Sequence, residues 1–139
     1  MLLTPKRWKY RKPIIRSLKW KSTRWTSVSF WDYWLKAMTS GYISNKQIEA
    51  ARKVIVRHIR KIGKIWIRIF PDVPFTKKWL EMPMGTGKGD VDIYTAPVRK
   101  WKILFEISWL DEEEAKKVLI SASKKLPVKA RVVAKGEIR

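Results

Sequence analysis

A helix followed directly by a strand, over residues 44–72, is the feature that most constrains what this chain can fold into. Ser44 and Gln47 have the spacing of a capping box, which predicts a helix beginning at Asn45. We expect that helix to span 45–62, because apolar residues recur there at helical spacing. The predicted apolar stripe comprises Ile48, Ala51, Ile55, Ile59 and Ile62.

Gly63 follows the predicted helix and is suited to the left-handed conformation that often ends one. From residue 65 to 69 isoleucine alternates with other residues, which is the period of a half-buried strand, and Pro71 should end that strand. The helix face opposite the stripe has only Glu49 to offset its cations, so we expect it to face an anion. These cations lie on or near that face: Lys46, Lys53, Arg57, Arg60 and Lys61.

Charge indicates the class of partner. The 139 residues include 32 Lys and Arg against 12 Asp and Glu, a net charge of +20. Such an excess favours a polyanion, with nucleic acid ahead of an anionic membrane. The chain has no cysteine, which excludes disulfides and cysteine-based zinc sites, and no apolar run reaches the roughly 18 residues that a membrane-spanning helix needs.

The positive charge is densest at the N-terminus, where no acid occurs before Asp32. We expect one domain over 1–139, with an extended basic arm at 1–27 that orders on its partner and a globular body at 28–139. A mitochondrial presequence is the alternative interpretation of such a basic, acid-poor start.

Further elements are predicted from alternation and turn residues. Val28–Met38 favours a strand with Val28, Phe30, Asp32 and Trp34 on one face, although a short helix is an alternative. Residues 82–90 form a glycine-rich loop, and a strand follows at 91–95. A turn at 99–102 should join it to an antiparallel strand at 103–108.

A second helix should begin after this strand, capped by Asp111 and Glu114 and ended by Pro127. A last strand is expected at 129–134. Strands grouped with two helices predict a single α+β domain with a mixed or antiparallel sheet. The apolar stripe of the second helix is Ala115, Val118, Leu119, Ala122 and Leu126.

No catalytic constellation emerges from the residues. Residues 85–88 superficially resemble a phosphate-binding P-loop, but Met82 and Gly89 stand where that motif needs glycine and Ser or Thr. His58 is the only histidine, so it has no partner for a histidine metal cluster. The acidic run 111–114 fits helix capping. We therefore expect no enzyme, no cofactor and no metal.

Several separated motifs resemble one family, the bacterial and organellar large-subunit ribosomal protein sixteen family, in order and interval along essentially the whole chain. They are P-K-R-W-K-Y-R-K at 5–12, Q-I-E-A-A-R at 47–52, G-K-I-W-I-R-I-F-P-D at 63–72, M-G-T-G-K-G at 84–89, L-F-E at 104–106 and K-L-P-V-K at 125–129. Because the family's own start resembles this one, the resemblance disfavours a presequence.

The resemblance implies an α+β fold of hammerhead type that binds large-subunit rRNA beside the central protuberance and helps place aminoacyl-site tRNA near the peptidyl-transferase centre. Neighbouring large-subunit proteins are implied partners; no membrane contact and no homo-oligomer are expected. The implied location is the ribosome of a bacterial cytoplasm, or of an organelle that encodes the protein.

On this resemblance, the residues of the arm and first helix that contact rRNA are Lys6, Arg7, Lys9, Arg11, Lys12, Arg16, Lys19, Lys21, Arg24, Arg52, Lys53, Arg57, Arg60 and Lys61. The loop that approaches tRNA is Met84, Gly85, Thr86, Gly87, Lys88 and Gly89. Many family members have arginine where this chain has Pro83, so an arginine contact at the tip is not expected.

Tryptophan is unusually frequent: the chain has 9 Trp and 6 Gly, whereas average usage gives roughly ten glycines. Only Trp66 matches a tryptophan typical of the resembled family, and Trp8 and Trp79 are unexpected there. Family glycines are typical at Trp20, Trp25, Trp31, Trp34, Trp101 and Trp109. We hypothesise that these are UGA codons read as glycine in the source; base stacking by a tryptophan-rich arm is the alternative.

A second class of function fits the same charge pattern, that of a free-standing nucleic-acid-binding protein. Salt separates the two, because phosphate contacts alone weaken steeply as salt rises, whereas assembly into a subunit should persist at moderate salt.

Overall fold

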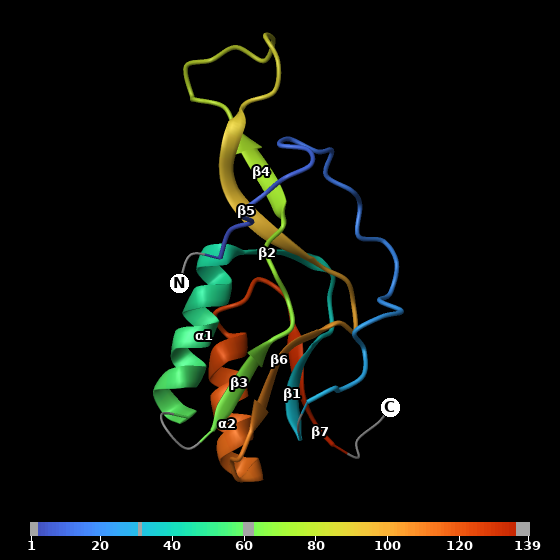
Figure 1. The fold of residues 1–139 in the computed structure, drawn as a ribbon, viewed down its shortest axis with the longest axis vertical. Coiled ribbons are helices and arrows are strands. Elements are labelled where there is room, and N and C mark those ends of the chain that lie inside the picture. Colours follow the sequence, from blue (N-terminus) through green and yellow to red (C-terminus); the bar gives the residue numbers. More distant parts are fainter. Residues whose placement is uncertain (1–2, 31, 60–62, 136–139) are drawn as a thin grey trace.

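The computed structural model describes residues 3–30, 32–59 and 63–135 and has the predicted α+β architecture (Figure 1). Within these ranges the residues before Asp32 form no helix or strand. The elements, in order, are β1 (Tyr33–Ala37), β2 (Gly41–Ser44), α1 (Asn45–Ile59), β3 (Lys64–Ile67), β4 (Val73–Lys77), β5 (Asp90–Val98), β6 (Ile103–Ser108), α2 (Glu112–Ser123) and β7 (Ala130–Ala134).

The strands form two antiparallel sheets. The first has the order β3-β6-β1-β7 and the second the order β2-β5-β4. α1 and α2 pack side by side against the first sheet, as Figure 1 shows, and the core lies between them. Leu35 pairs with Phe105 in register, and both side chains are fully buried in this core.

The start of α1 is confirmed in detail. The Ser44 N–H donates to Gln47 Oε1 at 2.9 Å, and the Gln47 N–H donates to Ser44 Oγ at 3.3 Å, which are the two bonds of a capping box. The predicted stripe is buried at Ile48, Ala51, Ile55 and Ile59. The expected end of the helix, including Ile62, lies outside the described residues.

The left-handed conformation expected at Gly63 follows residues outside the described ranges and stays a prediction. The structure shows a separate need for glycine there, which is close approach. A Cβ on Gly63 would lie 2.5 Å from Ile59 Cγ2 and 2.7 Å from the Ser108 carbonyl oxygen. The residue therefore lets the chain pass tightly between α1 and the end of β6.

Two predicted strands are shorter than expected. β1 begins at Tyr33, so Val28 and Phe30 do not belong to a strand face. β3 ends at Ile67, before the expected end at Pro71, although the Arg68 N–H still donates to the Leu104 carbonyl at 2.9 Å.

The predicted pairing of residues 91–95 with 103–108 was wrong, because β5 and β6 belong to different sheets. β5 pairs with β4 across the glycine-rich loop, so β4, this loop and β5 form the hairpin. The turn after β5 transfers the chain to the other sheet: the Trp101 N–H donates to the Ala37 carbonyl at 2.6 Å, and the Ala37 N–H to the Lys102 carbonyl at 2.9 Å.

α2 confirms its predicted helical core and corrects its predicted cap. Ala115, Val118, Leu119 and Ala122 are buried in it. Asp111 occupies the N-cap position but makes no side-chain cap hydrogen bond. The helix ends at Ser123, so Leu126 and Pro127 follow in a turn.

A buried ion pair attaches the residues before β1 to the sheet. Arg68 Nη1 lies 2.6 Å from Glu106 Oε1, and these side chains are 6% and 0% exposed. Glu106 Oε2 also accepts the Phe30 N–H at 2.9 Å, while Arg68 Nη2 donates to Ser29 Oγ at 3.2 Å. The Phe30 ring stacks on Trp66 at 5.8 Å. The sheet is thus covered on both faces, which explains why every residue of β6 is buried.

Candidate nucleic-acid interface

The basic arm, residues 1–27, lies against the body where it is described. The Trp8 ring stacks on Tyr94 of β5 at 5.9 Å. Farther along, the Ser22 N–H donates to the Lys100 carbonyl at 2.9 Å, and the Trp25 carbonyl accepts the Ile103 N–H at 3.0 Å. The arm therefore follows the second sheet and the 99–102 turn, as Figure 1 shows in blue.

Most predicted cations of the arm are exposed and available to phosphate. Exposed ones are Lys6, Arg7, Lys9, Arg11, Arg16, Lys19, Lys21 and Arg24. Lys12 is the exception, because it is half-buried and bonded to the hairpin.

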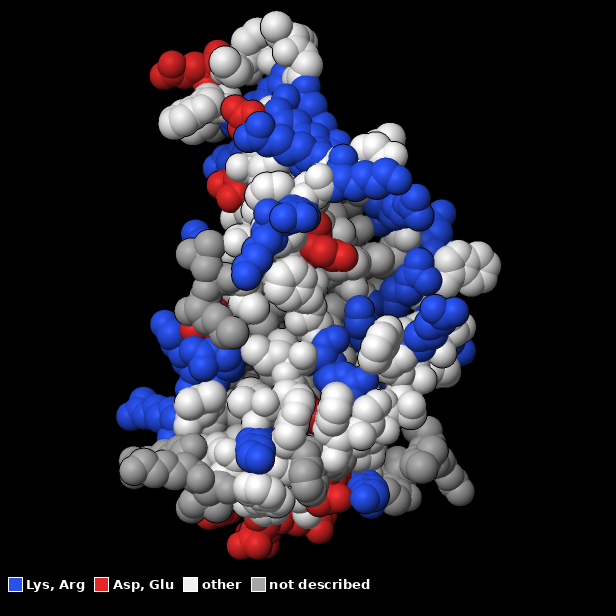
Figure 2. Space-filling view, viewed as in Figure 1, with Lys and Arg blue, Asp and Glu red and all other residues white. Residues whose placement is uncertain are grey.

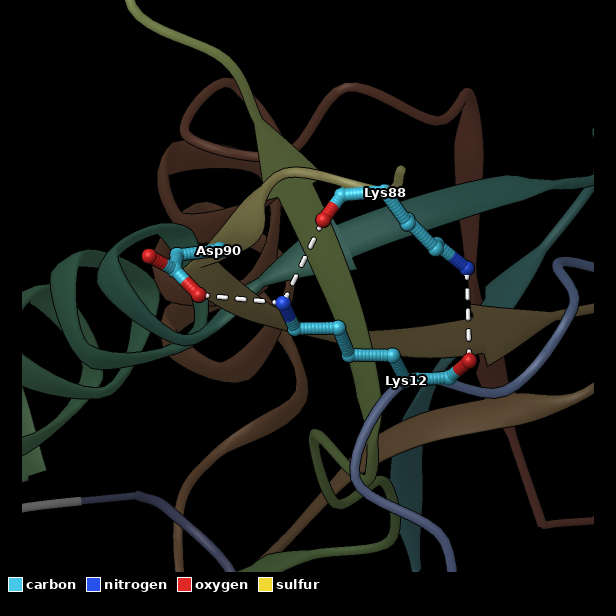
Figure 3. Close-up of polar contacts among 3 residues, drawn as sticks. All are labelled: Lys12, Lys88 and Asp90. Carbon is cyan, nitrogen blue, oxygen red and sulfur yellow. Dashed lines mark hydrogen bonds and ion pairs between the residues drawn. The ribbon is translucent and has the colours of Figure 1, made fainter. Parts of the chain in front are cut away.

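Lys12, Lys88 and Asp90 join the arm to the base of the hairpin, in an arrangement that we call the clasp (Figure 3). Lys12 Nζ donates to Asp90 Oδ1 at 3.0 Å and to the Lys88 carbonyl at 3.4 Å. Lys88 Nζ returns the contact, donating to the Lys12 carbonyl at 3.4 Å and to the Pro13 carbonyl at 2.9 Å. The hydrogen bond and charge of Lys12 lower the pKa of the Asp90 carboxyl.

The clasp changes what Lys88 can do. Sequence reasoning placed this residue among those that approach tRNA, but its ammonium group points back to arm carbonyls. We therefore regard Lys88 as a residue that holds the base of the loop. The free part of the loop lies before it.

The loop itself, residues 78–89, is organised by Lys78. Lys78 Nζ donates to three successive carbonyls, those of Pro83 at 3.3 Å, Met84 at 3.4 Å and Gly85 at 2.5 Å. Thr86 and Gly87 follow with φ of 66° and 89°. The ammonium group of Lys78, which follows β4, thus holds the backbone of residues 83–85 in place.

Two glycines of the loop have distinct requirements. Gly87 has a positive φ, which favours glycine. Gly89 packs against the opposite strand, since a Cβ there would lie 2.7 Å from the Lys77 carbonyl oxygen. Gly85 has nothing within 4 Å of a built Cβ. The tip exposes large apolar side chains: Trp79, Leu80, Met82 and Met84.

α1 offers fewer free cations than its sequence suggests. Arg52 is bonded to Glu49 twice, at 2.8 Å and 2.6 Å, and this contact lowers the pKa of Glu49 to about 2. Lys53 and Arg57 are exposed, as is His58. Arg60 and Lys61 lie outside the described residues.

Charge is distributed unevenly over the molecule. Figure 2 shows Lys and Arg gathered over the base of the hairpin and along the arm, with a few acidic residues among them, and a group of Asp and Glu at the opposite end, where α2 begins. The acidic residues there include Glu112 and Glu113, which pair with Lys116 and Lys117 at 2.5 Å and 3.9 Å. A polyanion is therefore attracted to the hairpin and arm.

The backbone at several tryptophans bears on the decoding hypothesis. Trp25, Trp101 and Trp109 have φ of 62°, 78° and 60°, a region that favours glycine. Trp20 and Trp34 do not have positive φ, and Trp34 is buried in β1 at 5% exposed. Trp31 lies outside the described residues. Glycine at the first three positions would remove backbone strain.

Sequence reasoning missed Lys78 and Asp90. No sequence motif marks either residue. Lys78 bonds backbone carbonyls of the loop, and Asp90 bonds the ammonium group of Lys12, so both contacts depend on how the hairpin and the arm fold. No group of His, Cys, Asp and Glu in the described ranges could hold a metal ion, and no helix among the same residues is long and apolar enough to span a membrane.

Comparison with known proteins gives one consistent family. The family profile of ribosomal protein L16p/L10e matches residues 5–133. "Large ribosomal subunit protein uL16" of Mycolicibacterium gilvum is 46% identical over 136 residues, covering 98% of this chain and 99% of that protein. Proteins of the same name from Mycolicibacterium vanbaalenii and Mycobacteroides abscessus are 45% and 44% identical over the same lengths.

Proposed function

The chain belongs to the ribosomal protein L16p/L10e family, and on that premise we propose that it is a structural component of the large ribosomal subunit. There it binds rRNA beside the central protuberance and helps to position aminoacyl-site tRNA near the peptidyl-transferase centre. Its role is structural and not enzymatic, as in the family. Its partners are large-subunit rRNA, that tRNA and neighbouring ribosomal proteins, and its location is a bacterial ribosome.

The observation that carries the proposal is the hairpin. β4 and β5 extend beyond the body and end in the exposed loop 78–89 (Figure 1). An element of this kind reaches a site at a distance from the surface that anchors the body. The arm's exposed cations supply the anchor, since Lys and Arg release counterions from RNA phosphates when they bind.

The residues divide accordingly. We assign rRNA phosphates to the exposed cations of the arm and to Lys53 and Arg57 of α1. We assign the tRNA approach to the loop from Met84 to Gly87, whose side chains are exposed. Lys78 and Lys88 support this loop from within, and their ammonium groups are occupied by carbonyl oxygens.

Sedimentation tests the assembly. The full chain should remain with large subunits in moderate salt, because many contacts act together. A mostly soluble pool with salt-sensitive binding to any duplex would instead support the free-standing nucleic-acid-binding protein.

Rapid kinetics test the loop. In subunits that carry Lys78→Met, aminoacyl-tRNA accommodation should slow while the occupancy of the protein stays normal, because the three carbonyls lose their common donor. The neighbouring exposed lysine gives a matched control, Lys77→Met, which should accommodate normally. Equal rates in both variants and the parent would contradict the tRNA role of the loop.

A further inference from the structure

A hollow of about 480 Å³ separates the arm from the second sheet and the 99–102 turn. Arm residues between Pro13 and Ser22 form one side of it. Tyr42, Val73 and Pro97 from the sheet form the other side, and Arg99 and Lys102 border it from the turn. None of these residues is a motif residue of the proposed tRNA loop.

Hydrogen bonds fix the walls of this hollow. The Tyr42 hydroxyl donates to the Arg16 carbonyl, and the Ser22 N–H donates to the Lys100 carbonyl at 2.9 Å, so the arm is tied to the body at two points of the wall. The Tyr42 ring also packs edge-to-face against Phe75, at 5.1 Å and 77°. Hydrogen bonds and ring packing therefore fix both the arm and the sheet where they border the hollow.

The lining combines two chemistries. Apolar side chains line the hollow from both sides: Leu18 belongs to the arm, and Val73 and Pro97 belong to the sheet. Three cations complete it: Arg16, Arg99 and Lys102. Apolar side chains and one tyrosine beside several cations suit a ligand that joins a planar ring to a negative charge.

Lys102 and Arg99 lie close enough for their charges to interact. Burial lowers the pKa of Lys102, the nearby carboxylate of Asp72 raises it, and the charge of Arg99 lowers it by less than Asp72 raises it. A bound phosphate would add a second anion beside this burial-strained lysine and its neighbouring arginine. No acidic residue is among the described residues that line the hollow.

We propose that this hollow binds one unpaired nucleotide of large-subunit rRNA, with the base against Tyr42, Leu18 and Pro97 and the phosphate at Lys102 and its neighbouring arginines. The inference rests on the proposed function and adds a base-binding site to the phosphate contacts. The hollow's volume of about 480 Å³ lies in the range of pockets that hold a small ligand. Unpaired bases are also what proteins recognise most readily in RNA.

The inference does not depend on how the tryptophans are decoded. Among the described residues that line the hollow there is no tryptophan. Either glycine or tryptophan at position 101 leaves the same cations and the same tyrosine in place.

Binding of the full chain to a short unstructured RNA, compared with a duplex of the same sequence, tests the site. Lys102→Met should weaken single-strand binding severalfold more than Lys100→Met does, because it removes the phosphate contact within the hollow, and should change duplex binding little. Lys100→Met is the matched control, since it removes the same charge from the same turn outside the lining. It should weaken both RNAs equally and slightly.

Leu18→Trp gives a second variant that keeps every charge. The larger side chain should fill the hollow and weaken single-strand binding as Lys102→Met does, with thermal melting of each variant confirming that it folds. Equal effects of Lys102→Met and Lys100→Met, together with no effect of Leu18→Trp, would overturn the proposal.

Two further measurements distinguish failure of this site from failure of the proposed function. Free adenosine monophosphate should bind much more weakly than the single strand; equally tight binding would reassign the hollow to a free nucleotide and overturn the rRNA assignment. Sedimentation of the same variants with large subunits tests the proposed function separately. A chain that sediments with subunits but fails the single-strand test loses only this site.

Discussion

Glycine and tryptophan make opposite demands on a backbone, and three tryptophans of this chain stand where φ is positive. A left-handed conformation costs most residues roughly 1–2 kcal/mol relative to glycine. Cation–π contacts of their side chains offset part of this free-energy cost. The ring centroid of Trp109 lies 4.9 Å from Lys64 Nζ, and that of Trp101 lies 4.4 Å from Lys21 Nζ. Exposed contacts of this kind contribute about 0.5–1 kcal/mol. The balance favours glycine at these sites.

The first prediction compares glycine and alanine at one position. Both Trp109→Gly and Trp109→Ala delete the ring, but only glycine relieves the φ of 60°. The free energy of unfolding of Trp109→Gly should therefore exceed that of Trp109→Ala by roughly 1 kcal/mol. Denaturant unfolding of the two variants measures the difference. Trp20 is the control: its φ is not positive, so alanine should be favoured there by about 0.5–1 kcal/mol.

The same order at both positions, with alanine better, would count against backbone strain at Trp109. Peptide masses of the protein purified from its source then decide the decoding itself. Glycine at positions 25, 101 and 109 would confirm recoding. Tryptophan there would establish a chain that tolerates the strain.

At the scale of elements, Gly63 sets how closely α1 approaches β6. The second prediction is that Gly63→Ala lowers the free energy of unfolding by about 1–3 kcal/mol, because its Cβ would lie 2.7 Å from the fixed Ser108 carbonyl oxygen. Denaturant unfolding measures the loss. Gly85→Ala is the control, since a Cβ there meets nothing within 4 Å, and it should change stability little. Equal effects would contradict the close-approach argument.

The helices could be predicted from sequence because their signals are local. The capping bond between Ser44 and Gln47 spans three residues, and the stripe of α1 repeats within the helix. The pairing of β5 could not be predicted from sequence, because a turn as short as 99–102 normally joins two strands of one hairpin. Here Trp101 and Lys102 bond Ala37 in the other sheet, and that contact is known only from the fold. Such distant contacts leave no periodic signal.

The clasp is a contact between two elements, and it gives the third prediction. Because the pKa of Asp90 is lowered by Lys12, the ion pair is present above the ordinary pKa of an aspartate and breaks as pH falls through the lowered pKa. Labels on Ile14→Cys and Met84→Cys, in a chain without native cysteine, should give a narrow distance distribution at neutral pH that broadens in strong acid.

Asp90→Asn should broaden the distribution already at neutral pH, because it removes the carboxylate that Lys12 Nζ contacts at 3.0 Å. Asp92→Asn is the matched control on the same strand and should leave it narrow. Since Asp90 is 92% exposed, we expect the arm to loosen without global unfolding. An unchanged distribution in Asp90→Asn would show that the clasp does not hold the arm.

For the whole molecule, the uneven charge matters more than the total of +20. The cations of the arm could be predicted as a candidate surface from composition alone, and most of them are exposed. The sequence could not show that Lys12, Lys88 and Arg52 are engaged within the chain, because the groups that bond them are known only from the fold or from side-chain orientation. We therefore expect the interface to consist of the cations that are exposed and not already bonded within the chain.

The fourth prediction separates position from total charge. Replacing Lys53 and Arg57 by glutamine should reduce the salt dependence of binding to large-subunit rRNA, by about one in the logarithmic slope for each phosphate that the variant no longer neutralises. Replacing Lys116 and Lys117 removes the same charge beside the acidic start of α2, so the slope should stay unchanged. Titrations at several salt concentrations measure both; equal slopes would mean that RNA responds to net charge alone and that the exposed face of α1 does not bind it.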